Sequence, residues 1–220
     1  MEIKTHCDVC RLCVKTEQYP GSKVCENKMI NKFKNGYWHN GNNWHVMQKG
    51  RVLTKATFKS TKNGRQAILK NKNTSTNITT DYSSIHHEIL DEWRNDISAF
   101  NREGQMENFI FYMTTHPFSQ ILEFSVNGFI IGFSWLIIVD NIVVDQLFPW
   151  RKKRYSNLCL GVFENEMLLE LWPGYAHFIG IDNEFKRKLG GWTYEGPVEL
   201  ENHPAMIKNE ETAASNKNYK

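Results

Sequence analysis

Four cysteines near the start of the chain have the type and spacing of metal ligands. Cys7, Cys10 and Cys13 form two successive C-x2-C steps, and Cys25 follows further along the same stretch. Thiolates held in this way can close a tetrahedral zinc site with Zn–S distances of about 2.3 Å. They also suit an iron–sulfur cluster. The spacing therefore predicts a zinc or iron–sulfur centre in residues 1–50 and does not separate the two metals.

A run of four cations, Arg151–Arg154, lies where a predicted strand leads into a predicted helix. Ser156 and Asn157 follow it, both of them helix-capping types, and the apolar stretch LCLGVFENEMLLEL comes next. The N-terminus of a helix offers unpaired N–H groups and the positive end of the helix dipole, so it binds phosphate well, especially beside cations. We interpret the run as a site for the phosphate of a nucleotide, a coenzyme or an RNA end. A solvated basic surface loop is the alternative.

Two acids on predicted central strands are candidates for a general base. Glu123 lies in ILEFS and Asp145 lies in IVVDQLF. Either carboxylate could accept a proton from an attacking amine if its strand brings it beside the substrate. Either could also be an ordinary polar residue on an exposed face of the sheet. The chain contains no GxSxG, P-loop or HExxH sequence, so serine hydrolase, P-loop and zincin chemistry have no support.

The elements that must position these residues follow from hydrophobic periodicity and turn signals. The pairs Asn127–Gly128 and Asp140–Asn141 predict turns between strands, and Pro173–Gly174 separates a helix from the last strand. That last strand follows a crossover helix, so it can pair in parallel with an earlier strand. The expected elements are a helix over 83–100, strands over 108–115, 119–126, 129–139 and 142–148, a helix over 157–171 and a strand over 175–181.

These elements predict an α+β, or mixed α/β, fold with one sheet. We divide the chain into a Cys-rich metal-binding segment over residues 1–50, a basic polar connector over 51–80, a domain over 81–205 and a disordered tail over 206–220. Within the connector, the stretch KNKNTSTN is expected to form an exposed loop.

The overall composition is that of a folded protein without a membrane span. The 220 residues are 40% hydrophobic, and the net charge of +3 is too small to indicate nucleic-acid binding by itself. The longest apolar run, Gly128–Val139, is too short to cross a bilayer, and the first residues lack an apolar signal-peptide core. We therefore expect a soluble, cytoplasmic protein with no membrane partner. Thiols stay reduced in the cytoplasm, which favours a metal over disulfides.

The order of motifs over residues 108–192 resembles the GNAT acyltransferases and, within them, the arginyl-tRNA–protein transferases. ILEFSVNGFIIG is similar to that family's strand carrying LE and the dG turn after it. QLFPWRKKRYSNLCLG is similar to its strand ending in Phe, its basic loop with Pro and its SLG helix start. YAHFIG and FKRKLGGW are similar to its YxYLG motif and a later YK pair. The matching residues are Glu123, Asn127, Gly128, Phe148, Pro149, Arg151, Lys152, Lys153, Arg154, Leu160, Gly161, Tyr175, Gly180, Phe185 and Lys186.

A weaker part of the resemblance lies at the start of the chain. The family begins with a C-x-x-C pair linked to a metal or iron–sulfur centre, followed by a GWRRSG stretch. This chain has Cys7 and Cys10 and then GYWHNG over Gly36–Gly41. The family's later adjacent Cys–Cys pair is missing, and Cys13 and Cys25 could replace it.

The resemblance implies a GNAT-like single twisted sheet with flanking helices, in which a parallel strand splays away from its neighbour. It also implies that the phosphates of the acyl donor lie at the N-terminus of the helix after the basic loop. To this donor site we assign Arg151, Lys152, Lys153, Arg154, Ser156, Asn157, Gly161 and Lys186.

From these features we expect an acyl or aminoacyl transferase, in which an amine attacks an activated acyl carbonyl and forms an amide. Backbone N–H groups near Gln146–Phe148 would face the developing oxyanion. The donor is aminoacyl-tRNA or, alternatively, acetyl-CoA. YSNLCLG lacks the first glycine of the Q/R-x-x-G-x-G/A signature of acetyl-CoA enzymes, which favours aminoacyl-tRNA. The acceptor amine, on a protein N-terminus or a small molecule, stays open.

A function without catalysis is the other alternative. Residues 49–73 are basic, and three aromatic residues lie shortly before them. Cations and aromatic rings together can bind nucleic acid, because the rings stack on bases while the cations meet the backbone. The chain would then be a metal-stabilised nucleic-acid-binding module. The aromatic residues are Tyr37, Trp38 and Trp44.

Overall fold

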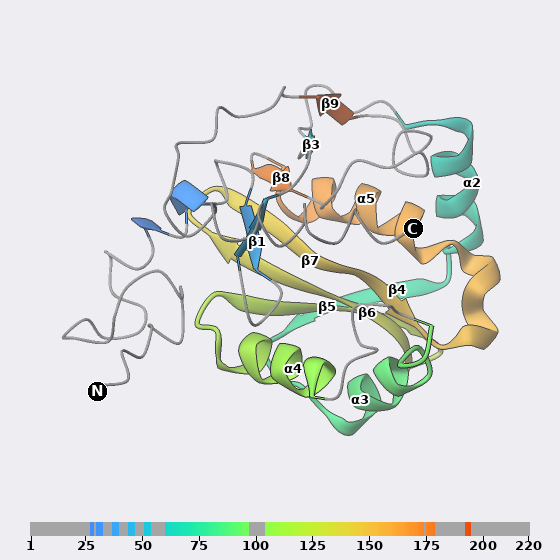
Figure 1. The fold of residues 1–220 in the computed structure, drawn as a ribbon. Coiled ribbons are helices and arrows are strands. Elements are labelled where there is room, and N and C mark those ends of the chain that lie inside the picture. Colours follow the sequence, from blue (N-terminus) through green and yellow to red (C-terminus); the bar gives the residue numbers. More distant parts are fainter. Residues whose placement is uncertain are drawn as a thin grey trace, which may run out of the picture.

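A mixed sheet forms the centre of the part of the chain that the structure describes, with seven strands in the order β4-β5-β6-β7-β8-β3-β9 (Figure 1). Its pairings are antiparallel except that between β7 and β8, which is parallel. A separate antiparallel pair is formed by β1 (Tyr37–His39) and β2 (Trp44–Val46). The seven strands are β3 (Arg51–Leu53), β4 (Thr74–Thr79), β5 (Ser119–Val126), β6 (Phe129–Val139), β7 (Ile142–Arg151), β8 (Ala176–Phe178) and β9 (Trp192–Tyr194). The computed structural model describes residues 27–28, 30–32, 37–39, 44–46, 51–53, 60–96, 104–173, 175–178 and 192–194.

The antiparallel meander β5-β6-β7 is set by its two turns. Asn127 and Gly128 both have a positive φ, at 52° and 79°, and Asp140 has a φ of 56°. Gly, Asn and Asp adopt this left-handed backbone more easily than other residues, and two-residue hairpin turns require it. The predictions of both turns and of the three strands are confirmed.

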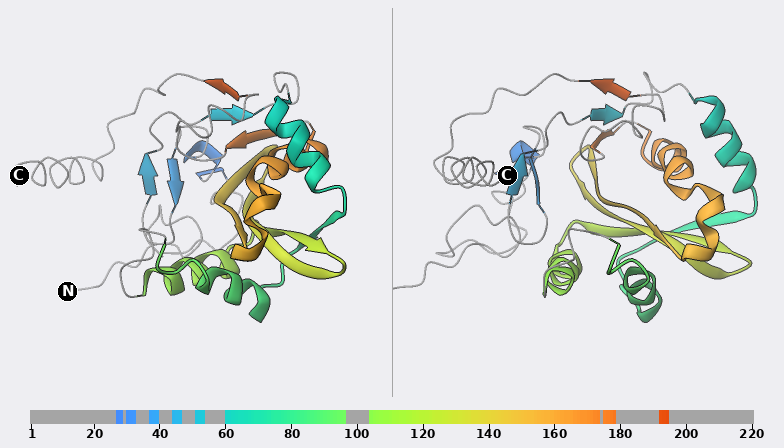
Figure 2. Two further views of the ribbon diagram at one scale, coloured as in Figure 1. Left: turned by 90° about the vertical axis from the view of Figure 1, so that its right-hand side faces the viewer. Right: turned by 45° about the vertical axis from the view of Figure 1, so that its right-hand side comes forward.

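Helices cover both faces of the sheet (Figures 1 and 2). On one face, α3 (Ser84–Asp91) and α4 (Gln105–Thr115) enclose a core with Trp135 and Phe133 of β6. On the other face, α2 (Lys62–Lys70) and α5 (Leu160–Leu171) enclose a second core with Leu136 and Val143. No helix in the described part of the chain is long and apolar enough to cross a membrane.

The path from β7 through α5 to β8 joins two parallel neighbouring strands by a crossover helix. The register pairs Ile142, Val143 and Val144 of β7 with Ala176, His177 and Phe178 of β8. A meander, a basic turn, a helix and a parallel strand therefore follow one another as the GNAT resemblance implied. The prediction of a mixed α/β fold with flanking helices around one main sheet is confirmed.

The prediction of a strand over residues 108–115 is wrong, because this stretch belongs to α4. Its β-branched and aromatic residues suggested a strand. The buried side chains instead recur at helical spacing, which lets them all face the sheet from one side of a helix. These buried residues are Met106, Phe109, Tyr112 and Met113.

The segment predicted to be a connector, residues 51–80, contributes to the main domain. Thr61 caps α2 by accepting a hydrogen bond from the Gly64 N–H at 3.1 Å. KNKNTSTN was expected to be a loop, and this is wrong from Thr74 onward, because β4 pairs with β5 over six residues. An edge strand needs only one hydrogen-bonded neighbour and can stay polar, so its composition resembles that of a loop.

Gly132 of β6 marks a close approach between the sheet and α5. A Cβ atom added at Gly132 would lie 2.6 Å from the carbonyl oxygen of Trp150 and 2.9 Å from Leu160 Cδ1. Real Cβ atoms do not come so close, so this position requires glycine. The first turn of α5 thus rests directly on the β6 backbone.

We predict that Gly132→Ala lowers the free energy of unfolding by about 1–3 kcal/mol, because the added methyl group meets a backbone carbonyl that cannot move aside. Urea unfolding followed by tryptophan fluorescence measures this change. Gly128→Asn is the matched control, since Gly128 has a positive φ but nothing within 4 Å of an added Cβ. Asn tolerates this backbone, so the control should cost less. Equal losses at the two positions would contradict the steric explanation.

Candidate functional site

The candidate site begins where β7 continues past its partner strand. In the described part of the chain, β8 pairs with β7 only as far as Val144, and β7 runs on to Arg151 beside β6. The β6–β7 register shifts twice, between Phe133 and Trp135 and between Trp135 and Leu136. Each shift adds one residue to β7, and such bulges bend and twist a strand. The segment predicted to provide oxyanion N–H groups therefore lies in the irregular part of β7.

The helix after β7 begins later than predicted. A 3-10 helix, η2 (Lys153–Leu158), follows the strand, and α5 begins at Leu160. Cys159 is the N-cap residue in a left-handed conformation with a φ of 54°, and its side chain makes no capping hydrogen bond. Ser156 and Asn157 are exposed residues of η2, so the prediction that they cap the helix is wrong. The first turn of α5 thus keeps its positive end without a side-chain cap.

Acidic residues of α3 and the turn after it hold two of the four cations of the basic run. Lys152 Nζ lies 3.8 Å from Glu88 Oε2, and Lys153 Nζ lies 2.6 Å from Asp96 Oδ2. The backbone N–H of Lys153 also donates to Glu92 Oε2 at 2.7 Å. These carboxylates recur at intervals of four residues, so they lie along one side of the helical segment. That spacing was a signal in the sequence, and it was missed.

Trp93, in the turn after α3, also fixes the basic run in place. Its indole N–H donates to the carbonyl oxygen of Arg151 at 2.6 Å. The Arg151 guanidinium and the Lys153 ammonium lie 5.3 Å and 5.2 Å from the centre of the ring. Such cation–π contacts add to the hydrogen bond. Arg154 is exposed instead, with its guanidinium 4.9 Å from the centre of the Tyr155 ring.

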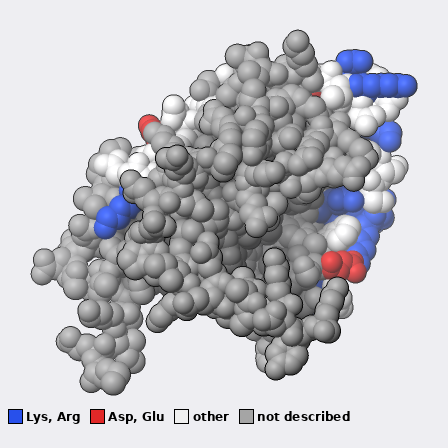
Figure 3. Space-filling view, turned by 45° about the horizontal axis from the view of Figure 1, so that its top comes forward, with Lys and Arg blue, Asp and Glu red and all other residues white. Residues whose placement is uncertain are grey.

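The cations extend from the basic run onto α2. Lys70 Nζ donates to the carbonyl oxygen of Asn157 at 3.3 Å, which brings the end of α2 beside η2. On the face drawn in Figure 3, Lys and Arg side chains gather along one margin of the molecule, with carboxylates beside one group. We use the name basic surface for the exposed cations of these elements, which are Lys62, Arg65, Lys70, Lys153 and Arg154.

Glu123, a predicted catalytic residue, is buried and has both carboxylate oxygens engaged. Oε1 lies 3.1 Å from His86 Nε2, and Oε2 accepts from Asn77 Nδ2 at 2.9 Å. His86 Nδ1 in turn accepts the backbone N–H of Ser83 at 3.0 Å, so the ring is neutral and donates to Glu123. Burial is the main cause that lowers the pKa of His86, against the opposing effect of Glu123. This contact could not be predicted from the sequence, because nothing local connects residues 86 and 123.

The structure does not bring Glu123 to the first turn of α5. Glu123 is paired with Phe133, whose ring lies in the α3–α4 core against His86, whereas α5 covers the opposite face. Asp145, the other predicted base, is paired with Leu136 at the second register shift of β7. Its side chain is not among those described. The catalytic assignments of both acids stay predictions.

Other predicted site residues lie outside the described residues. Cys7, Cys10, Cys13 and Cys25 of the predicted metal centre are among them, and so is Lys186 of the predicted donor site. Within the described residues, no group of three or more His, Cys, Asp and Glu side chains could hold a metal ion. The metal centre therefore stays a prediction.

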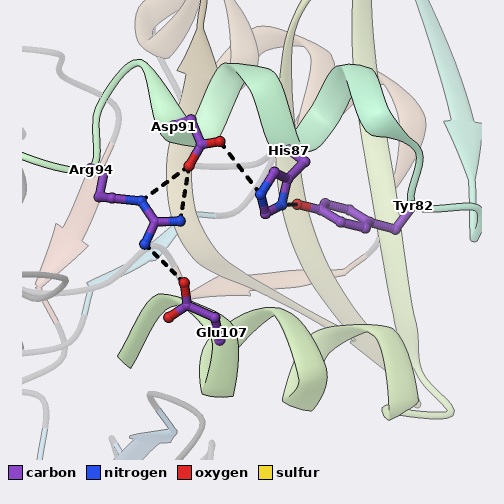
Figure 4. A network of polar contacts seen from close by, with 5 residues as sticks. All are labelled: Tyr82, His87, Asp91, Arg94 and Glu107. Carbon is purple, nitrogen blue, oxygen red and sulfur yellow. Dashed lines mark hydrogen bonds and ion pairs between the residues drawn. The ribbon is translucent and has the colours of Figure 1, made fainter. Parts of the chain in front are cut away.

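A polar network links α3 to α4 on the surface (Figure 4). Tyr82 Oη lies 3.2 Å from His87 Nδ1, and His87 Nε2 lies 3.4 Å from Asp91 Oδ2. Asp91 also pairs with Arg94, which reaches Glu107 of α4 at 2.8 Å. Burial, and then the charge of Asp91, raises the pKa of Tyr82, so its phenol stays protonated. The network holds α3, and with it the acids facing the basic run, against α4.

Comparison with known proteins gives similarity only to solved structures. No protein-family model matches the chain, and no curated protein sequence matches it. L-PGS from Bacillus licheniformis is 14% identical with a TM-score of 0.43, and the alignment covers 83% of this chain and 56% of that one. A GCN5-related N-acetyltransferase from Kribbella flavida is 9% identical with a TM-score of 0.39, over 67% of this chain and 54% of that one. A functionally unknown conserved protein from Staphylococcus epidermidis is 13% identical with a TM-score of 0.43, over 80% and 66%.

The chain spans little more than half the length of the first two of these structures. All three TM-scores lie below 0.5, and the fold is defined by its strand order and crossover. The resemblance to arginyl-tRNA–protein transferases stays a prediction.

We predict that the free energy of unfolding falls as the pH drops below about 6.5. The pKa of His86 is lowered by folding, so below its ordinary value of 6.5 the unfolded chain binds a proton that the folded chain does not. His86→Gln keeps an amide donor for Glu123 but cannot be protonated. It should reduce the loss between pH 7 and pH 5, by at most about 1.36 kcal/mol per pH unit.

Urea unfolding at several pH values measures this slope. His116→Asn is the comparison, because burial lowers the pKa of His116 to about 3 and its Nδ1 accepts the Phe118 N–H, as an Asn oxygen could. Each variant should remove part of the slope, and the double variant should remove more. A slope unchanged in His86→Gln would show that His86 is not neutral in the folded protein.

Proposed function

We propose that the chain is a GNAT-type acyltransferase that joins an activated acyl group to an amine. The observation that carries the proposal is the course of β7. This strand continues beyond its described pairing with β8, bulges twice and leads through a cationic turn into an uncapped helix end. Where β7 has no neighbouring strand on one side, its backbone N–H groups can donate to a carbonyl oxygen of the donor. The N-terminal end of α5 attracts phosphate.

The chemistry needs a donor carbonyl, an amine and a base in line. In the proposed arrangement the donor extends along β7, with its carbonyl at the N–H groups near Gln146–Phe148 and its phosphates at the first turn of α5. The oxyanion that forms when the amine attacks is then stabilised by groups already in place, which costs no reorganisation. The amine must lose a proton, so a carboxylate near the bulge is required. When the oxyanion collapses to the amide, the bond to the carrier breaks and the tRNA hydroxyl or CoA thiol leaves with a proton.

Asp145 is the better candidate for that base. It belongs to the irregular segment of β7, whereas both oxygens of Glu123 already accept hydrogen bonds. A substrate amine could reach a Glu123 oxygen only by displacing Asn77 or His86. We therefore assign to Glu123 the role of anchoring α3 to the sheet, and to Asp145 that of general base.

Aminoacyl-tRNA is the donor that we favour over acetyl-CoA. The basic surface continues from η2 along α2, which is more cationic area than a single pyrophosphate occupies. A polyanion such as the acceptor end of tRNA can meet all of these cations through its backbone. The acetyl-CoA signature is incomplete in YSNLCLG, as noted above.

We predict that aminoacyl-tRNA binds with an affinity that falls steeply with salt, and that acetyl-CoA does not bind. Arg154→Gln should weaken tRNA binding and lower the slope of log affinity against log salt by about 1, because an exposed cation is lost. Lys153→Gln should have a smaller effect, since Asp96 already neutralises that charge. Filter binding with charged and uncharged tRNA measures both quantities.

Thermal shifts with the same ligands give an independent readout, since a ligand that binds the folded state raises its stability. Stabilisation by acetyl-CoA and not by tRNA would favour the acetyltransferase alternative. Tight binding of RNA or DNA without transfer of an amino acid to any amine would favour the nucleic-acid-binding module.

We also propose that the four N-terminal cysteines bind zinc or an iron–sulfur cluster. The purified chain should contain about one zinc ion or one cluster per molecule by elemental analysis and absorbance, and Cys→Ser changes at Cys7, Cys10, Cys13 and Cys25 should remove it. Cys159→Ser is the control, because this exposed cysteine lies at α5. A wild-type protein that is folded and free of metal would exclude the site.

A further inference from the structure

Within the described part of the chain, the outer edge of β4 is open. β4 is the terminal strand in the sheet order, and it pairs with β5 alone among the strands of the described residues. Ser75, Asn77 and Ile78 are exposed on it. An antiparallel strand directs half of its N–H and C=O groups away from its partner. On β4 these groups point to the margin of the sheet, where another strand can bind them.

The usual features that protect an edge strand are missing from β4. The strand reads TSTNIT, without a charged residue or a proline. Its six pairs with β5 follow one another without a bulge. By contrast, β9 at the other margin has only three residues in the described part of the chain. In natural proteins, edge strands that stay unpaired usually carry charges, prolines or bulges that prevent pairing. An edge strand without these features therefore indicates a binding partner.

Apolar side chains lie beside this edge. Ile78 of β4 is 42% exposed, and it is paired with Leu122, which lies in the core under α2 and α5. On α2, Lys70 reaches η2, so Ile68, about 200° around the helix, lies on the flank turned away from η2. Ile68 and Leu69 are 38% and 70% exposed. The open backbone edge is thus accompanied by an apolar strip.

We propose that this edge pairs antiparallel with the same edge of a second copy of the chain, forming a dimer with one continuous sheet. A two-fold axis makes the surface its own partner, so every group on one copy meets its counterpart on the other. Pairing centred on Thr76 or on Asn77 keeps both apolar strips on one face of the joint sheet. Ile68 and Ile78 of the two copies then lie on that common face, with Ile78 next to the seam.

Charge complementarity favours a second copy over an unrelated peptide. Centring on Thr76 places Lys72 opposite Thr80 of the second copy, and centring on Asn77 places it opposite Tyr82. In both cases Asp81 of the second copy is one residue away from that position. Lys72 and Asp81 are both exposed, and they flank β4 at its two ends. The two-fold axis therefore forms two such ion pairs from one sequence.

The dimer leaves the proposed donor site open, because β4 is separated from β7 by two strands. Loss of the dimer and loss of tRNA binding can thus be observed separately. The inference does not depend on the proposed function.

Sedimentation velocity of the full chain over a range of concentrations tests the proposal. The wild type should sediment as a dimer, and Ile78→Lys should weaken dimerisation roughly tenfold or more by placing a charge in the covered strip. Phe129→Lys is the matched control, since Phe129 is 73% exposed at the β5–β6 turn, away from the edge, and should leave the dimer unchanged. A wild type that stays monomeric at every concentration would overturn the proposal, whatever other protein it binds.

Charge exchange tests the orientation of the two copies. Lys72→Glu and Asp81→Lys should each weaken the homodimer, because each creates two like-charged pairs. An equal mixture of the two variants should form a heterodimer, in which both pairs have opposite charges again. If either variant dimerises as strongly as the wild type, or if the mixture stays monomeric, the antiparallel β4 pairing is wrong.

Discussion

The contact between the first turn of α5 and the backbone of β6 is the constraint on which the rest of the site depends. Leu160 packs over Gly132, and the carbonyl of Trp150 occupies the space where a Cβ atom would lie. Since α5 sits so close to the sheet, the chain leaving β7 has little room and turns through η2 with a left-handed residue at Cys159. The bulges in β7 supply the bend that this turn needs. Packing thus places the cationic turn at the end of the helix.

The basic run is held in position from α3 and is not simply solvated. Trp93 fixes its backbone by a hydrogen bond to Arg151, while Glu88, Glu92 and Asp96 meet its charges and N–H groups. Exposed ion pairs contribute little to stability, so the phosphate of the proposed donor would replace the carboxylates at small cost. The indole contact does not depend on charge and would remain. In the proposed function the loop therefore exchanges its anion while its backbone stays in place.

The parts of the fold that could be predicted from sequence are those with a local cause. The turn at Asn127–Gly128 and the turn at Asp140 depend on residues that accept a positive φ, and the strands between them are strongly apolar. α4 could not be predicted in this way, because its aromatic residues favour a strand until the sheet offers them one common face. The prediction of a loop at β4 was wrong for the opposite reason. Its polar residues form a strand only because β5 provides hydrogen-bond partners.

The sequence alone determined the alternation of apolar strands and turns, the concentration of cations before a helix and the presence of acids on the central strands. These are properties of neighbouring residues, and neighbours interact whatever the rest of the chain does. Only the tertiary structure decided that Glu123 meets His86, that acids of α3 and of the turn after it neutralise part of the basic run, and that Trp93 fixes its backbone. Those contacts join residues far apart in the chain, and their formation depends on how two helical layers pack against one twisted sheet.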